Sequence, residues 1–72
     1  MYRIEYLTET TDADSVCHAF DSNEKDLDAV EAQAWARRAS ARRKGATGFQ
    51  VRHVNAVDRV VSIVNFAPEH AD

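Results

Sequence analysis

The sequence contains little of what usually holds a very small protein together. Its 72 residues include a single cysteine, Cys17, so that no internal disulfide can form. A domain of about 60 residues buries only about 60% of the surface that its unfolded chain exposes, and such chains commonly need a disulfide, a metal or a second subunit. With the disulfide excluded, we expect self-association, as a homodimer or a higher homo-oligomer. A lone thiol also agrees with a reducing cytoplasm.

Long apolar runs are missing as well. The stretch 1–9 lacks the apolar segment of a signal peptide, and nothing in the chain approaches the roughly 20 apolar residues that a membrane-spanning helix needs. We therefore expect a cytoplasmic protein without membrane contact. Nine basic and twelve acidic side chains give a formal charge of −3, so no overall positive field would attract nucleic acid.

Glycine and proline are equally scarce. The two glycines, Gly45 and Gly48, are too few to form a loop that cradles phosphate. The one proline, Pro68, cannot continue a β-ladder and marks the end of the folded part. We expect one α+β domain over 1–67 and a flexible C-terminal tail over 68–72.

Short stretches of alternating polar and apolar residues flank a central helical segment. This period of two is typical of strands with one buried face. Polar segments at 8–14 and 55–58 are rich in turn-forming residues and separate these stretches. The predicted strands are 1–8, 15–20, 49–55 and 59–66, of which 15–20 could instead be an irregular lead-in to the helix.

The longest periodic stretch, 23–44, predicts one long helix. Ser22 or Asn23 can cap its start, where acidic residues complement the helix dipole. Basic residues crowd its end, and Gly45 then tolerates the left-handed conformation that stops a helix. The elements together predict a β(β)αββ two-layer sandwich, in which a mainly antiparallel sheet of three or four strands carries one helix on one face.

That helix covers only one face of the predicted sheet. The last strand is apolar on both sides, since Val60 and Val64 oppose Val61 and Ile63. One of these pairs therefore faces away from the helix. In so short a chain, we expect a second copy to cover it.

The helix itself has two apolar sectors. The narrow sector that would face the sheet holds Leu27, Val30, Ala34 and Ala41. The second sector contains the only tryptophan, and two interpretations of it are open. The tryptophan either folds over the edge of its own sheet or anchors a symmetric dimer between helices, with small residues allowing close approach. The self-association face of the second interpretation comprises Ala32, Trp35, Ala36 and Ala39.

A basic cluster ends the helix. A nucleic-acid interface would need its cations on one face with aromatic platforms nearby, whereas these are spread around the helix. Arg38 and Arg42 do pair beside Trp35. The alternative is a solvated helix end that complements the dipole, and we rank nucleic-acid binding behind it. The candidate basic patch comprises Arg38, Arg42, Arg43 and Lys44.

Residues with catalytic or metal-binding chemistry are few. Cys17 and His18 are neighbours on a predicted strand and face opposite sides, which prevents a thiolate–imidazole pair. His18 and His53 lack further ligands at the spacing of a zinc site. We expect no enzymatic activity, no metal and no cofactor.

If 15–20 is not a strand, the β-α-β-β order and the chain length resemble the dodecins, small flavin-storing proteins with one long helix on a three-stranded antiparallel sheet. The Phe-x-Val pair at Phe49 and Val51 belongs to this resemblance. The dodecin aromatic that stacks on flavin precedes this pair, where the present chain has Gly48. The leading hypothesis is a small non-enzymatic module that self-associates and can bind a protein partner. A dodecin-like small-ligand binder and a nucleic-acid-binding module are the alternatives.

Overall fold

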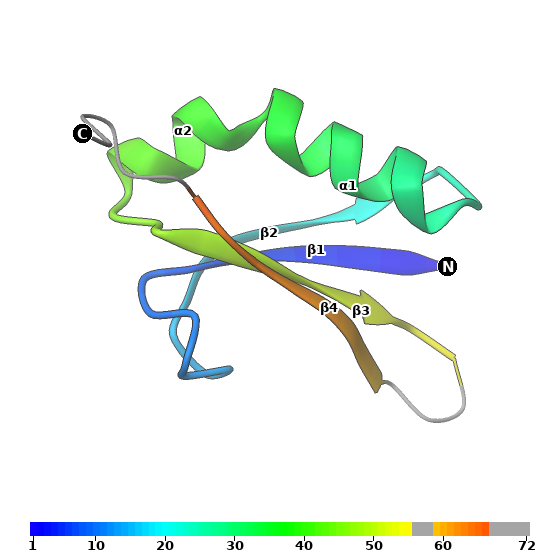
Figure 1. Cartoon of the computed structure of the whole chain (residues 1–72), viewed down its shortest axis with the longest axis horizontal. Helices are drawn as coiled ribbons and strands as arrows, with labels where there is room; N and C mark the ends of the chain where they lie inside the picture. The colour runs from blue at the N-terminus through cyan, green and yellow to red at the C-terminus, as the bar shows by residue number, and fades with distance from the viewer. Residues whose placement is uncertain (56–58, 67–72) are drawn as a thin grey trace.

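A computed structural model describes residues 1–55 and 59–66 and shows an α+β domain in two layers (Figure 1). A four-stranded antiparallel sheet carries two short helices on one face. The α+β class predicted from the sequence is confirmed. The predicted tail at 68–72 and most of the predicted turn at 55–58 lie outside the described residues. The elements are β1 (Tyr2–Leu7), β2 (Val16–Ser22), α1 (Leu27–Ala36), α2 (Arg38–Arg43), β3 (Gly48–His53) and β4 (Arg59–Asn65).

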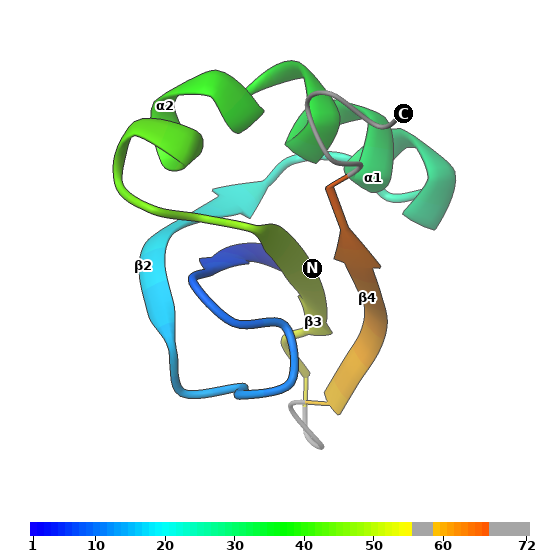
Figure 2. The ribbon, with the colours of Figure 1, turned by 60° about the vertical axis from the view of Figure 1, so that its left-hand side comes forward.

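The sheet has the strand order β2-β1-β3-β4. Two hairpins, β1–β2 and β3–β4, are joined by antiparallel pairing of β1 with β3, in which Tyr2 lies opposite His53 and Leu7 opposite Gly48. The stretch at 15–20 therefore belongs to a genuine strand. It forms one edge of the sheet and β4 forms the other, with both helices above (Figure 2).

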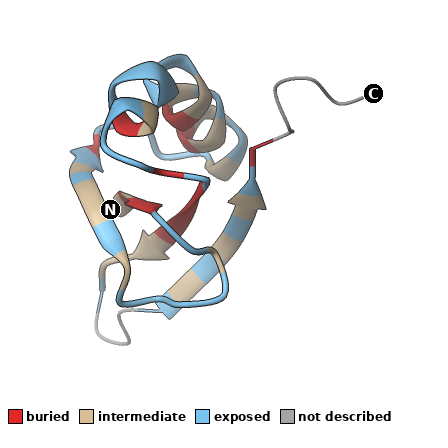
Figure 3. Ribbon diagram, turned by 90° about the vertical axis from the view of Figure 1, so that its left-hand side faces the viewer, coloured by how far each residue is buried: buried red, intermediate tan, exposed pale blue. Residues whose placement is uncertain are grey.

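The core lies between the helices and the two central strands. Ile4 and Tyr6 of β1 and Phe49 and Val51 of β3 occupy alternate positions, all point toward the helices, and are fully buried. Figure 3 shows the buried residues on the central strands and the facing sides of the helices. The predicted helical stripe is confirmed, since Val30, Ala34 and Ala41 are fully buried and Leu27 packs against the core.

The prediction of one long helix over 23–44 is wrong at its start and in its middle. The helix begins four residues later than predicted, where Asp26 caps it by accepting the N–H of Ala29 at 3.4 Å. Neither predicted cap acts on the helix: Ser22 Oγ instead accepts the N–H of Glu24 at 3.1 Å, within the turn that follows β2. The helix then breaks at Arg37 and resumes as α2.

A tertiary contact coincides with this break. The Tyr6 hydroxyl donates to the carbonyl oxygen of Ala34 at 2.5 Å, and Arg38 Nη1 donates to that of Trp35 at 2.6 Å. In a continuous helix, these carbonyls would accept backbone N–H groups four residues further on. Side chains inserted into this ladder are a known cause of kinks. Periodicity could not predict the break, because Tyr6 lies 28 positions before Ala34.

The sheet face opposite the helices is partly covered by the chain itself. The loop between β1 and β2 lies on this side (Figure 1). Leu7 and Gln50 point away from the helices and are nevertheless fully buried, and Gln50 Nε2 lies 3.4 Å from the carbonyl oxygen of Ala13 in this loop. The loop therefore closes the Leu7 end of the outer face and touches β4 at Asn65, whose side-chain oxygen accepts from the Thr10 hydroxyl.

Candidate functional site

The predicted self-association face is divided by the fold. Trp35 is half-buried and packs on its own core, with its ring centroid 6.1 Å from that of Phe49 and 5.5 Å from that of Phe66. This placement agrees with the interpretation that Trp35 folds over the sheet. The other members of the face, Ala32, Ala36 and Ala39, are exposed.

The basic cluster is divided as well. On the β4 side, the guanidinium groups of Arg38 and Arg42 each lie 5.1 Å from an aromatic centroid, over Trp35 and Phe66 respectively. These contacts hold both cations against rings of the core. The rings that could stack on a nucleotide base are therefore already in contact with guanidinium groups.

The remaining cations include two that reach the β2 side. Arg37 lies 4.5 Å from the ring centroid of Phe20, and Lys44 Nζ lies 3.2 Å from His18 Nδ1. The exposed Arg43 has neither contact. The Arg37–Phe20 contact could not be predicted from the sequence, because helix spacing carries no information on which strand lies beside the helix. The cluster flanks α2 on two sides and does not form one surface.

The histidines predicted as poor metal ligands lie apart. His18 is opposite Tyr6 on β1 and its ring lies 5.9 Å from that of Tyr6, whereas His53 is opposite Tyr2 near the other end of β1. Cys17 is free and partly buried beside His18. Over residues 1–55 and 59–66, no three side chains of the metal-binding types come together.

Tyr6 is a titratable group that is fully buried between the sheet and the helices. Burial raises the pKa of Tyr6 from its ordinary value of 10 to about 12, while the positive charges of Arg37 and Arg38 act in the opposite direction. The hydroxyl therefore stays protonated at neutral pH. It is fully buried and donates to the carbonyl oxygen of Ala34.

Strand β4 presents an apolar edge. Ile63 is 56% exposed and Val61 is 39% exposed. The N–H of Phe66 donates to the carbonyl oxygen of Thr47 at 2.9 Å, so these two residues form a hydrogen-bonded pair. Hydrogen-bonded and non-hydrogen-bonded pairs alternate along an antiparallel ladder. Ile63 lies three positions before Phe66, and its backbone groups therefore point away from β3. Because the side chain of Ser62 bonds to Glu31 of α1, the neighbouring Ile63 side chain points to the opposite face of the sheet.

A polar network lies next to this edge on the same face. Gln50, opposite Ile63, donates from Nε2 to Glu5 Oε1 at 2.6 Å, and Arg52 Nε donates to the same oxygen at 3.2 Å. Glu5 and Arg52 thus form an ion pair with little exposure to solvent. Gln50 Oε1 is buried and accepts no hydrogen bond from any described residue.

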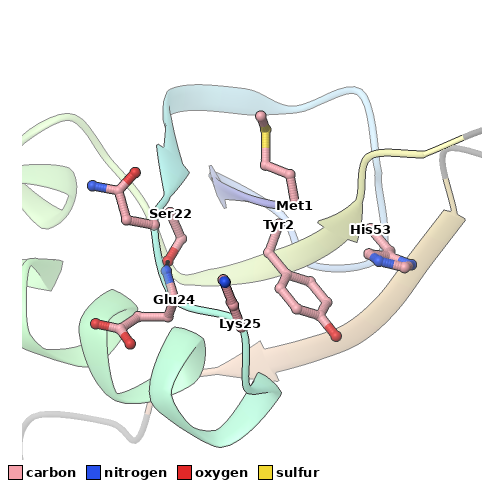
Figure 4. Close-up of a pocket in the computed structure, with 7 residues that line it drawn as sticks. Met1, Tyr2, Ser22, Glu24, Lys25 and His53 are labelled. Carbon is pink, nitrogen blue, oxygen red and sulfur yellow. Dashed lines mark hydrogen bonds between the residues drawn. The ribbon is translucent and has the colours of Figure 1, made fainter.

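A hollow of about 380 Å³ opens at the end of the sheet where β1 begins and β2 and β3 end (Figure 4). Tyr2 and His53 form part of its wall, with ring centroids 4.9 Å apart. No sequence motif marked this hollow, because its residues come from three separate segments. Its lining residues are Met1, Tyr2, Ser22, Asn23, Glu24, Lys25 and His53.

Comparisons with protein-family models, curated proteins and solved structures found no match to this chain. Within the described residues, neither helix is long and apolar enough to span a membrane. We therefore infer the function from the surface features themselves. Two of these stand out, the exposed edge of β4 and the hollow beside Tyr2 and His53.

Proposed function

We propose that this chain is a non-enzymatic binding module that associates with a second copy of itself along β4. The observation that carries the proposal is Ile63, a large apolar side chain that is 56% exposed on an edge strand. An edge strand offers backbone donors and acceptors to another strand, and proteins usually protect such edges. A second copy would cover both the apolar side chains and the open backbone groups.

The two edges of the sheet differ in protection. Strand β2 carries a charged residue, Asp21, whose Oδ1 lies 3.0 Å from Nε of Arg3 on β1, and an irregular register near Cys17. Charges and bulges of this kind discourage pairing with another strand. Strand β4 also has an irregular register, at its start, but from Val60 to Asn65 it contains no charged residue. The regular and uncharged end of β4 favours this edge.

A two-fold axis perpendicular to the sheet would pair β4 with its copy in antiparallel orientation. The product is a continuous eight-stranded sheet with the helices of both copies on one face. The two Ile63 side chains would lie near one another on the opposite face, where cross-strand apolar pairs stabilise a sheet. This arrangement uses the same surface on both copies, as a closed dimer requires.

Sedimentation equilibrium of the purified chain tests the proposal. The wild type should form a dimer at micromolar concentration, and Ile63→Lys should be monomeric because two like charges would face each other across the axis. Val16→Lys is the matched control, since Val16 is 40% exposed on the other edge strand. A wild type that stays monomeric at high micromolar concentration, or a dimer lost only in the Val16 variant, would refute the proposal.

Two observations weigh against the alternatives. A dodecin-like binder was proposed for a three-stranded sheet, whereas β2 makes the sheet four-stranded. A nucleic-acid-binding surface built from Arg38, Arg42 and Trp35 would leave Arg37 and Lys44 on the other side of α2. Self-association along β4 needs neither feature.

A further inference from the structure

The hollow beside Tyr2 and His53 has the size of a small-molecule site. Its volume of about 380 Å³ lies within the range of about 300 to 1,000 Å³ that is usual for ligand pockets. It is distant from the regular end of β4, because His53 pairs with Arg59 at the beginning of that strand. A ligand here would therefore be independent of the proposed dimer contact at Ile63.

The wall of the hollow is suited to a planar group. Tyr2 and His53 lie opposite each other on β1 and β3, with their ring planes inclined by 31° and their centroids 4.9 Å apart. Both rings are half-buried, so that each retains surface accessible to a ligand. Aromatic ligands gain both apolar burial and ring contacts against such a wall.

His53 and Lys25 bring hydrogen-bond donors to the lining of the hollow. Asn55 Nδ2 lies 2.9 Å from His53 Nδ1, and with this amide as donor the neutral imidazole carries its hydrogen on Nε2. Lys25 adds an ammonium group from the segment before α1. The one carboxylate in the lining, Glu24, points away from Tyr2 in Figure 4. This set of groups favours an anion.

Hydrogen bonds order the segments around the hollow without a ligand. Ser22 is 3% exposed, and its hydroxyl donates to Gln33 Oε1 at 2.5 Å while accepting the N–H of Glu24 at 3.1 Å. The N–H of Val54 bonds to the carbonyl oxygen of Met1 at 2.8 Å. Since these bonds already order the segments, binding would require little further ordering of the backbone.

We propose that this hollow binds a small aromatic carboxylate, with its ring against Tyr2 and His53 and its carboxylate paired with Lys25. The ring contact supplies apolar burial, and the charge-assisted hydrogen bond selects the sign of the ligand. No bond is made or broken, so this is a binding site and not a catalytic one.

Titration with 2-naphthoate, followed by NMR of the labelled chain, tests the proposal. The signals of Tyr2 and His53 should shift saturably, and 2-naphthylmethylammonium, a cation of similar shape, should bind at least about tenfold more weakly. Lys25→Gln should weaken naphthoate binding by about tenfold, the value of one charge-assisted hydrogen bond. Lys44→Gln is the control, because Lys44 lies beside His18 and away from the hollow.

The proposal would be overturned by equal affinity for the anion and the cation, by an affinity unchanged by Lys25→Gln, or by shifts centred on Trp35 in place of Tyr2. The Ile63→Lys variant should bind naphthoate as the wild type does. Loss of binding in that variant would place the probe at β4 and would also overturn the proposal. A monomeric wild type that still binds naphthoate would refute self-association alone.

Discussion

The hydroxyl group of Tyr6 donates a hydrogen bond of 2.5 Å to the backbone carbonyl oxygen of Ala34, between the sheet and the helices. This bond connects the end of β1 to the last part of α1, shortly before the break at Arg37. Both residues are fully buried. The bond therefore links the position of the helices over the sheet to a single side chain.

Replacing Tyr6 with phenylalanine should destabilise the fold by about 1 to 2 kcal/mol, because a buried carbonyl loses its donor. Chemical denaturation of the two proteins measures the difference. Tyr2→Phe is the matched control, since the structure shows no hydrogen bond from the Tyr2 hydroxyl to a described residue, and its effect should be within about 0.5 kcal/mol. Equal losses in both variants would contradict the role assigned to the Tyr6–Ala34 bond.

The raised pKa of Tyr6 predicts a loss of stability in alkali. The pKa of Tyr6 is about 12 in the folded chain, against the ordinary value of 10 that applies to the unfolded chain. Folding therefore favours the neutral phenol. This contribution is fully present below pH 10 and is lost as the pH rises toward 12, by an amount on the order of 2 to 3 kcal/mol.

The Tyr6→Phe variant lacks this titration and provides the measurement. The difference in free energy of unfolding between wild type and Tyr6→Phe should be constant from pH 7 to about pH 9.5 and should shrink above pH 10. Denaturation series at several pH values would show it. A difference that stays constant up to pH 12 would show that Tyr6 titrates alike in both states.

Gly48 occupies a position with no room for a side chain. A Cβ added there would overlap the carbonyl oxygen of Val64 and Cγ2 of Thr10. Gly48→Ala should therefore force β3 and β4 apart and cost about 3 kcal/mol. Gly45→Ala should cost only about 1 to 2 kcal/mol, because its φ of +96° is strained for alanine but its Cβ would have ordinary contacts. Thermal unfolding ranks the two, and the reverse order would contradict the packing around Gly48.

Two substitutions of the buried Gln50 should differ in their effect on stability. Gln50→Met removes a donor to Glu5 but also a buried acceptor without a described partner, so the change should be within about 1 kcal/mol. Gln50→Glu places a second carboxylate against Glu5 and should cost at least about 3 kcal/mol. Denaturation at pH 7 compares them. Similar stability of the two variants would mean that the Glu5–Gln50 contact is not formed in solution.

Local patterns in the sequence were sufficient for much of the fold. Alternation located the strands to within about two residues, although it left open whether 15–20 is one, and the helical stripe of Val30, Ala34 and Ala41 is the stripe that faces the sheet. These features depend on neighbours along the chain, and burial selects the same period that the sequence displays. The candidate sites were harder to predict, because the hollow draws on three segments that no local pattern connects.

The sequence by itself determined the strands at 1–8, 49–55 and 59–66, which helical stripe is apolar and that β4 is apolar on both sides. Only the tertiary structure decided where the helix breaks, that Trp35 packs on its own sheet and that Ile63 remains exposed. The physical reason is the range of the interactions. Periodicity reports contacts within one turn or one strand, whereas the Tyr6 hydroxyl reaches Ala34 across 28 positions and the β1–β2 loop covers Gln50 but not Ile63.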